Sequence, residues 1–445
     1  MQSNQQSPGE LSQAFGQALQ EQMERSPRLA LWLLQRSQTL LERFIHFYQA
    51  LNWLPRWTQR RWQRKLGASL AGVALALALN GAPALYAADI TVTTAIPAIN
   101  DGDGLCSLIE AIVNANDDSA LYADCAPGSG ADVITLTGGF YGLAGKHEGD
   151  SALPIITSAI TIQGNGATIG RGGSGLYRIF EVTSTGDLTL NDTTITGGAH
   201  TPGAGIFNNG GILTLNNSTV SGNTNEFVEG GGILNNGGTV TLNNSAVSGN
   251  VARSGGGIVN KSGAVTLHNS TVSGDVAQFW DGAGIVNRGT MTLSNSTVSN
   301  NRTSGYDSGG IENHNTLTLT NSTVSGNRAD SGGGLRNVSG TATLVNTIIA
   351  NSVSGGDCVR NGGTINASHS LIEGGLGCVN GTNVNNLTGD PNVGPLQDNG
   401  APGGRPTFTH ALLDGSPAID AGDSAAALDA LGQPLTTDQR GPGFP

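Results

Sequence analysis

Charged and aromatic residues are scarce in this chain of 445 residues. Only 12% of the residues are charged and 5% are aromatic, whereas glycine occurs 68 times without the strict triplet of collagen. This composition argues against a compact helical domain. The length would accommodate two or three average domains, but a solenoid grows by repetition and can use the same length as one.

The few charges are distributed unevenly. Residues 1–88 carry 9 Lys+Arg and 4 Asp+Glu, and the rest of the chain carries 12 and 29, a net charge of −17. An acidic body repels nucleic acid and anionic polysaccharide unless a cation bridges them. We therefore expect no nucleic-acid partner.

Cysteine is also rare, and all four cysteines lie after residue 88. No two of them have the short spacing of zinc ligands, so the sequence predicts no metal site of this kind. Four cysteines allow three disulfide pairings, and proximity favours Cys106 with Cys125 and Cys358 with Cys378. Each pair would then stabilise one end of the body.

An apolar run, LGASLAGVALALAL, is too short for a comfortable transmembrane helix. It comes after the basic RWTQRRWQRK and precedes the small residues of GAPALYAAD, which is the order of a secretory signal. The sequence therefore predicts a signal region and cleavage zone at 66–88, with cleavage at 84–88 and a mature chain that begins near Asp89. An uncleaved membrane anchor is the alternative. Residues 1–65 are an N-terminal extension, either helical or the product of a misassigned start codon.

From this signal we expect Sec-type export to a bacterial envelope or extracellular location, with no transmembrane span in the mature chain. Export also makes disulfides the expected state of the cysteines.

The body of the chain is an internal repeat of about 26 residues. The motif GGGI-x-N recurs at intervals of 27, 25, 27, 26 and 24 residues. A second motif, T-L-x-N-S-T-V-S-G-N, accompanies it, so each unit holds three short pieces in which apolar and polar residues alternate with the period of a strand. The core positions of the first motif are Ile206, Ile233, Ile258, Ile285, Ile311 and Leu335.

Three short strands that return every 24 to 27 residues wind into a triangular coil. The expected fold is therefore all-β, a right-handed parallel β-helix (a pectin-lyase-like solenoid) of about nine or ten coils. We expect the β-helix at 131–385, an N-terminal cap at 89–130 and a separate C-terminal segment at 386–445. Ser107 to Glu110 has a capping-box pattern and predicts a short helix over the first coil.

Two columns of asparagine occupy fixed positions of the repeat. Stacked side-chain amides can hydrogen-bond along the axis of such a stack, so we interpret both columns as structural ladders. Asp275 interrupts the second column, where its carboxylate can still accept from neighbouring amides. The first column is Asn208, Asn235, Asn260, Asn287, Asn313 and Asn337; the second is Asn223, Asn250, Asn301 and Asn327.

Several segments resemble known families. CSLIEAI, from Cys106 to Ile112, resembles the CSLREAI signature of the CSLREA domain, with Ile109 in place of the usual arginine. ADVITLTGGFYGL, PIITSAITIQGNGATI and LYRIFEV are similar to the segments that come after that signature in bacterial right-handed parallel β-helix proteins. The repeats are similar to the GGA[IL] and FxxN repeats of polymorphic outer-membrane proteins, without the phenylalanine. The tail, DPNVGPLQDNG through TDQRGPGFP, resembles a choice-of-anchor region. These resemblances imply an envelope or extracellular location and no particular activity.

One edge of the predicted coil carries candidate ligand-binding residues. Glu229, Asp281 and Asp307 stand four residues before the GGGI core position, and Trp280 and Tyr306 stand one residue earlier. Successive coils would place the two aspartates about 5 Å apart at backbone level. Carboxylates beside aromatic residues suit sugars, and two carboxylates that close can recruit a cation. A solvated loop edge is the alternative interpretation.

No catalytic set is recognisable in the sequence, although polysaccharide-degrading enzymes share the predicted fold. The clustered aspartates, HG and RxK of polygalacturonases are absent. The NDGDG segment at 100–104 starts like a calcium loop but has Ile112 where an EF-hand needs glutamate, so a turn is expected. We expect no cofactor and keep calcium as a candidate ligand.

Two functions remain open. The first is an exported, non-catalytic surface or secreted protein, adhesive or ligand-presenting, whose partners are glycans or another cell-surface component. The second is a carbohydrate-active enzyme, a polysaccharide lyase or glycoside hydrolase, on the side of the β-helix. An autotransporter passenger is a third interpretation.

Overall fold

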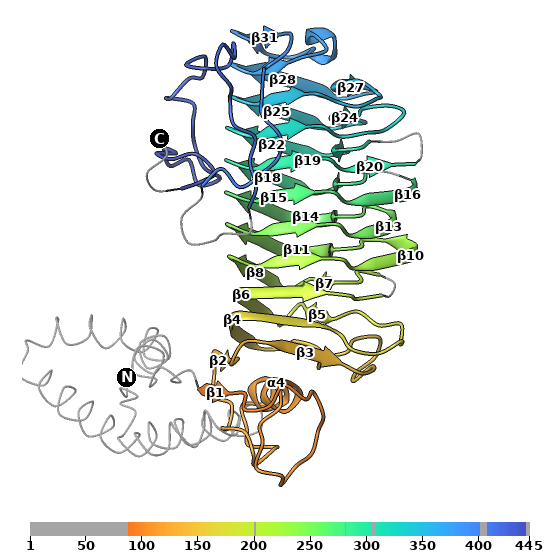
Figure 1. The fold of residues 1–445 in the computed structure, drawn as a ribbon, viewed down its shortest axis with the longest axis vertical. Coiled ribbons are helices and arrows are strands. Elements are labelled where there is room, and N and C mark those ends of the chain that lie inside the picture. The colour runs from red at the N-terminus through yellow and green to blue at the C-terminus, as the bar shows by residue number, and fades with distance from the viewer. Residues whose placement is uncertain (1–87, 200–201, 281, 305–307, 401–406, 442–445) are drawn as a thin grey trace, which may run out of the picture. The chain divides into compact units, whose positions relative to one another are not determined.

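The computed structural model describes residues 88–199, 202–280, 282–304, 308–400 and 407–441. These residues form a parallel β-helix of about nine turns with little helix, as the repeat predicted (Figure 1). They belong to one compact unit. The predicted N-terminal extension and signal region lie outside the described residues.

Three parallel sheets run along the axis. The GGGI motif forms one of them, and the two halves of the T-L-x-N-S-T-V-S-G-N motif form the other two. The TL sheet contains the T-L-x-N motif. Its strands are β1 (Asp89–Thr91), β2 (Asp132–Thr135), the first halves of β4 (Ala159–Arg171) and β6 (Asp187–Thr196), β8 (Ile212–Asn216), the second halves of β11 (Ile233–Asn243) and β14 (Ile258–His268), β18 (Thr290–Ser294), β22 (Thr316–Thr320), β25 (Thr341–Val345), β28 (Thr364–Ser368) and β30 (Asn383–Val384).

The TVS sheet contains the S-T-V-S motif, and the GGGI sheet contains the GGGI motif. The TVS sheet consists of β3 (Phe140–Leu143), the second halves of β4 and β6, β9 (Thr219–Ser221), β12 (Ala246–Ser248), β15 (Thr271–Ser273), β19 (Thr297–Ser299), β23 (Thr323–Ser325), β26 (Ile348–Ala350), β29 (Leu371–Ile372) and β31 (Leu387–Thr388). The GGGI sheet consists of β5 (Phe180–Thr183), β7 (Ile206–Asn209), the first halves of β11 and β14, β17 (Ile285–Asn287), β21 (Ile311–Asn313), β24 (Leu335–Asn337) and β27 (Cys358–Arg360).

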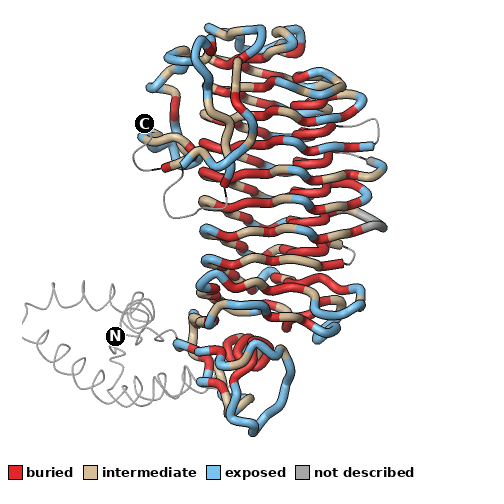
Figure 2. Tube along the Cα trace, in the orientation of Figure 1, coloured by how far each residue is buried: buried red, intermediate tan, exposed pale blue. Residues whose placement is uncertain are grey.

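The interior is a continuous apolar column. Buried residues recur in every turn of the coil (Figure 2). The register stacks like on like: Ile258 lies between Ile233 and Ile285, and Leu267 lies between Leu242 and Leu293. All six side chains are fully buried. Since each turn adds a similar layer of branched apolar residues, burial of this column is the main stabilising contribution.

The first end of the column is covered by a helix, and each end carries a disulfide, as predicted. Helix α4 (Leu108–Asn116) begins with a complete capping box, in which Ser107 accepts from the backbone of Glu110 and Glu110 accepts from that of Ser107. The helix buries Leu108 and Ile112 in the same core. Disulfides join Cys106 to Cys125 and Cys358 to Cys378, which confirms the local pairing. The short 3₁₀ helix η2 (Leu376–Cys378) leads into the last turns.

The C-terminal segment runs back along the outside of the TVS sheet (Figure 1). Gln439 is buried there and hydrogen-bonds Thr271 and Thr297, 2.8 and 2.6 Å away. His410 contacts the hydroxyl of Ser299 at 2.9 Å. The segment therefore buries the outward-facing hydroxyls of several turns, an arrangement that the repeat pattern did not indicate.

The predicted asparagine columns lie buried at two corners of the coil. In the first column each side-chain amide donates to the side-chain oxygen of the next turn, at 2.8, 2.9, 3.0, 2.8 and 2.7 Å from Asn208 to Asn337. In the second column Asn223 donates to Asn250 and Asn301 donates to Asn327. Each buried amide thus finds in the next turn a hydrogen-bond partner that water would otherwise supply.

A third polar column, which was not predicted from the sequence, lies at the remaining corner of the coil. It is the Asn-Ser pair between the TL and TVS motifs. The asparagines have φ near +50°, which this residue tolerates better than most, and the serines are buried and bond the next turn. The recurring NS dipeptide was the available signal. The asparagines are Asn217, Asn244, Asn269, Asn295, Asn321 and Asn346. The buried serines, each directly after one of the first five asparagines, are Ser218, Ser245, Ser270, Ser296 and Ser322.

Candidate functional site

The outer face of the GGGI sheet is covered by the loops that precede each GGGI motif. The middle residue of each strand points outward, and Phe207, Leu234, Val259 and Val286 form a small second apolar cluster. The loops approach closely because they use glycine: Gly255 has φ +64°, and a Cβ there would lie 2.0 Å from Cγ2 of Val259. The sheet is therefore shielded, and the loops present the accessible surface.

A short parallel sheet, the side ladder, is built into these loops. It consists of β10 (Thr224–Glu229), β13 (Val251–Ser254), β16 (Val276–Trp280) and β20 (Arg302–Thr303). Asn225, Ala252 and Ala277 stack in register, and the register shifts beyond them. The ladder projects from one side of the coil (Figure 1).

Two exposed phenylalanines and an arginine lie on the side ladder. Phe227 and Phe279 are 61% and 59% exposed. Arg253, in the turn between them, places its guanidinium carbon 5.8 Å from the centre of the Phe279 ring. Two turns separate the phenylalanines, a rise of about 10 Å along the axis. Phe227 and Phe279 stand six residues before the core positions Ile233 and Ile285, one residue beyond the predicted ligand edge, and their shared position was the available signal in the sequence.

Glu229 is the one predicted ligand-edge residue whose side chain the structure describes. Its carboxylate pairs with Lys261 at 2.9 Å and with Arg288 at 3.0 Å, both from later turns. Burial raises the pKa of Glu229, but the hydrogen bond and charge of Lys261 and the charge of Arg288 outweigh it and lower the pKa. Glu229 is therefore an ionised carboxylate and is poorly suited to act as a general acid.

The other predicted edge residues are only partly described. The backbone of Trp280 ends β16, opposite Ser254. Its side chain, and Asp281, Tyr306 and Asp307, lie outside the described residues. The predicted proximity of the two aspartates stays a prediction.

A second charged group lies further along the same side. Glu312 has an exposed fraction of 1%, and its carboxylate lies 2.7 Å from Nε2 of His314 and 3.3 Å from Arg336. Burial raises the pKa of Glu312, but the hydrogen bond and charge of His314 and the charge of Arg336 lower it below its usual range. Sequence reasoning missed the group because its members are spread over two turns, and the register brings Glu312 and Arg336 together.

Within residues 224–360, the described charged residues gather on this side of the coil. The TL and TVS strands between residues 239 and 350 contain no Asp, Glu, Lys or Arg. Apart from the buried Asp275, the charged residues that the structure describes between 224 and 360 lie in GGGI strands, the side ladder or the loops and turns that flank them.

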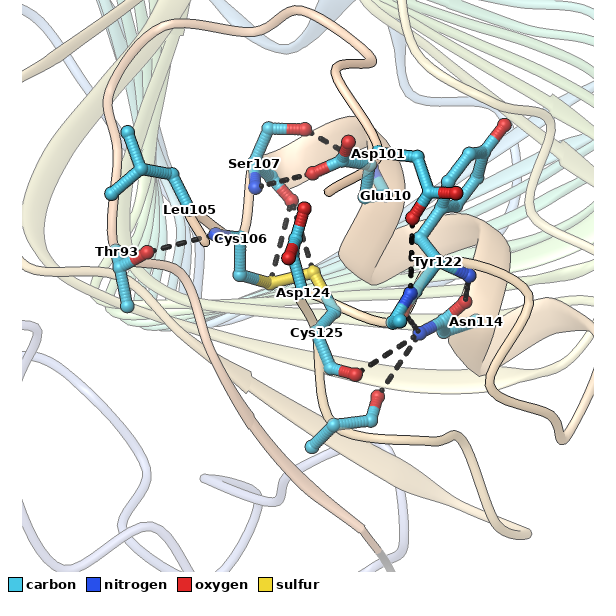
Figure 3. The surroundings of a disulfide bond; sticks show 12 residues. Thr93, Asp101, Leu105, Cys106, Ser107, Glu110, Asn114, Tyr122, Asp124 and Cys125 are labelled. Carbon is cyan, nitrogen blue, oxygen red and sulfur yellow. Dashed lines mark hydrogen bonds between the residues drawn. A yellow bond between two sulfur atoms is a disulfide. The ribbon is translucent and has the colours of Figure 1, made fainter. Parts of the chain in front are cut away.

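The NDGDG segment lies beside the first disulfide (Figure 3) and forms a turn that a carboxylate of the same chain occupies. Asp124 accepts from three successive backbone amides, those of Gly102, Asp103 and Gly104. Asp101 accepts from the amide of Ala123. These bonds fix the loop beside the first disulfide, so the loop has a structural role.

Two further findings concern the described part of the chain. No cluster of three or more His, Cys, Asp or Glu side chains there has the geometry to hold a metal ion. No helix within the same residues is long and apolar enough to cross a membrane.

Comparison with known proteins found no matching family model, no matching curated protein and no matching solved structure.

Proposed function

We propose that this chain is an exported, non-catalytic β-helix protein of the bacterial surface or medium, and that its side ladder binds glycans. The observation that carries the proposal is the exposed pair Phe227 and Phe279 with Arg253 between them. Exposed aromatic rings on ordered strands offer flat apolar faces to sugar rings at little entropic cost. A guanidinium beside them supplies hydrogen-bond donors for hydroxyl or carboxylate groups.

Export is supported by the basic, apolar and small-residue order of the region that ends at residue 88 and by the two disulfides. The resemblance of Cys106 to Ile112 to the CSLREA signature favours the same compartment. A non-catalytic role is supported by the state of Glu229, whose charge is neutralised by two cations.

The test is glycan-array binding by the exported protein, with and without calcium. Replacing both Phe227 and Phe279 by alanine should weaken binding of retained glycans about tenfold, the effect of losing roughly 1.4 kcal/mol. Phe140→Ala is the matched control, because Phe140 is also a half-exposed phenylalanine, 53% exposed, on the distant strand β3. Unchanged binding by the double variant would reject the side ladder as the binding surface.

The second candidate function is a carbohydrate-active enzyme on the same side, and the contact between Glu312 and His314 favours it. A carboxylate that orients an imidazole is a common arrangement for general base catalysis. Analysis of retained glycans for shortened or unsaturated products distinguishes the two functions. Products that disappear in His314→Ala would establish the enzyme.

A further inference from the structure

Asp132 is a buried residue whose carboxyl group lies next to Ala88, the first described residue of the chain. Its exposed fraction is 1%. Oδ1 accepts from the backbone amides of Ala88 at 3.0 Å and Ser129 at 2.8 Å, while Oδ2 is buried and has no hydrogen-bond partner. Burial, the largest effect, raises the pKa of Asp132, and the nearby charge of Asp118 adds to it. A buried oxygen without a donor is costly, so a donor or a cation is expected there.

Ala88 is held in place next to this carboxyl group. Its carbonyl accepts from the amide of Val133 at 2.8 Å, and its side chain packs against the apolar core. Strand β1 then starts at Asp89, which pairs with Val133 in parallel register. The β-helix therefore fixes residue 88 and the strand that begins after it.

We propose that the export signal is removed by hydrolysis of the bond between Ala87 and Ala88, and that the new α-ammonium group of Ala88 forms an ion pair with Asp132. Water adds across the amide bond, which leaves a carboxylate on Ala87 and an amine on Ala88 that takes up a proton. The inference rests on the export part of the proposed function.

The change from amide to ammonium supplies what Asp132 lacks. The nitrogen of Ala88 already lies 3.0 Å from Oδ1 and has a single hydrogen to donate. An ammonium group has three hydrogens and a positive charge, so it can donate to Oδ2 as well and compensate the buried negative charge.

The geometry selects one bond within a zone that the sequence leaves open. Cleavage after Ala84 would leave Leu85 as the first residue and an ordinary amide at Ala88. Cleavage after Ala88 would remove the residue that contacts Asp132. Only cleavage after Ala87 places a charged amine at the carboxyl group.

The first experiment determines the N-terminus of the exported protein, produced from the full chain in a bacterial host, by intact mass and N-terminal sequencing. We expect Ala88 as the first residue. Leu85 or Asp89 would overturn the inference and leave the proposed export intact. An unprocessed chain retained in the cell would contradict export itself.

The second experiment measures how fast the α-amine is acylated in the native protein, as a function of pH. An ion pair with a carboxylate raises the pKa of an amine by roughly one unit or more, so native labelling near neutral pH should be about tenfold slower than in Asp132→Asn. Lys146 and Lys261, resolved by peptide mapping, are internal references. Equal rates in both proteins would overturn the ion pair.

Asp187→Asn is the matched control, since it removes one carboxylate from the TL sheet two turns further along. It should label at the wild-type rate. If Asp132→Asn does not fold, wild-type protein alone decides the matter. The midpoint of the labelling profile should then lie at a higher pH in the native state than in denaturant. Equal midpoints would reject the ion pair.

Discussion

The side-chain amide of Asn250 donates a 2.9 Å hydrogen bond to Oδ1 of Asp275, the acidic residue in a column of amides. The other oxygen, Oδ2, is buried and has no hydrogen-bond partner. A Cβ added to Gly257 would lie 2.7 Å from Oδ2, and one added to Gly284 would lie 2.7 Å from Nδ2 of Asn301. Oδ2 therefore occupies the place of a ladder amide nitrogen.

The position of Oδ2 favours the protonated form of Asp275. The nitrogen of Asn301 donates to the carbonyl of Val272 and to the side-chain oxygen of Asn327. An ionised Oδ2 in the equivalent place would face two acceptors, whereas a protonated one can donate to one of them. Burial likewise raises the pKa of Asp275 well above its usual value.

Asp275→Asn should stabilise the protein at neutral pH by about 1–3 kcal/mol, because it restores a donor at a buried position. The pKa of Asp275 is raised in the folded state. The stability that Asp275 contributes is therefore fully present below its unfolded-state pKa and is lost as the pH rises from that value through the folded-state pKa. The advantage of the variant should therefore grow from about pH 4 to 7. Thermal unfolding across this range measures it, and a constant difference would contradict the assignment.

Asn287→Ala should cost about 2–4 kcal/mol. The change removes one ladder bond on each side, to Asn260 and to Asn313, and the bond to the carbonyl of Thr316, so buried polar groups in both adjacent turns lose a partner. Asn236→Ala is the matched control, since the 3.1 Å bond of Asn236 to Asn209 is exposed. Denaturant unfolding compares the two, and equal losses would contradict a special role for the buried ladder.

Acidification should release the C-terminal segment from the TVS sheet. Nδ1 of His410 donates to the carbonyl of Gly394, so neutral Nε2 accepts from Ser299. Burial lowers the pKa of His410, so the docked segment has its full stability above the ordinary histidine pKa and loses it as pH falls through the lowered value.

Hydrogen exchange of residues 407–441 at pH 7 and pH 5 measures this release. In His410→Gln the side chain at this position does not titrate, so the segment should be equally protected from exchange at pH 7 and pH 5. Equal protection of the wild-type segment at both pH values would show that His410 does not control docking.

Removal of the Cys358–Cys378 disulfide by a double serine substitution should destabilise the C-terminal turns by about 2–4 kcal/mol. In a solenoid each turn mainly contacts its neighbours, so the loss should stay local. Limited proteolysis should cut near residues 358–388 and spare the middle turns. Increased cleavage throughout the chain would instead indicate one cooperative unit.

Much of the fold could be predicted because a solenoid repeats its register. Ile233, Ile258 and Ile285 stack because the same motif recurs in consecutive turns. The same logic gave the asparagine columns, whereas the local disulfides were predicted from the proximity of the cysteines in the sequence. The candidate site was harder to predict. Phe227 and Phe279 occupy the same repeat position, six residues before Ile233 and Ile285, but the repeat pattern does not show that both rings are exposed or that Arg253 lies beside Phe279. Asp281 and Asp307, chosen from the sequence alone, lie outside the described residues.

The sequence by itself determined the parallel coil and its apolar column, since neighbouring turns of one repeat interact over a fixed spacing. It also determined the capping helix, through its capping box, and the two disulfides, through the proximity of their cysteines. Only the tertiary structure decided which non-repeating residues meet. It brought Glu229 to Lys261 and Arg288, Glu312 to Arg336, Gln439 to the TVS sheet and Asp132 to Ala88. Such contacts depend on loop paths and on side chains from distant segments, which no periodic pattern records.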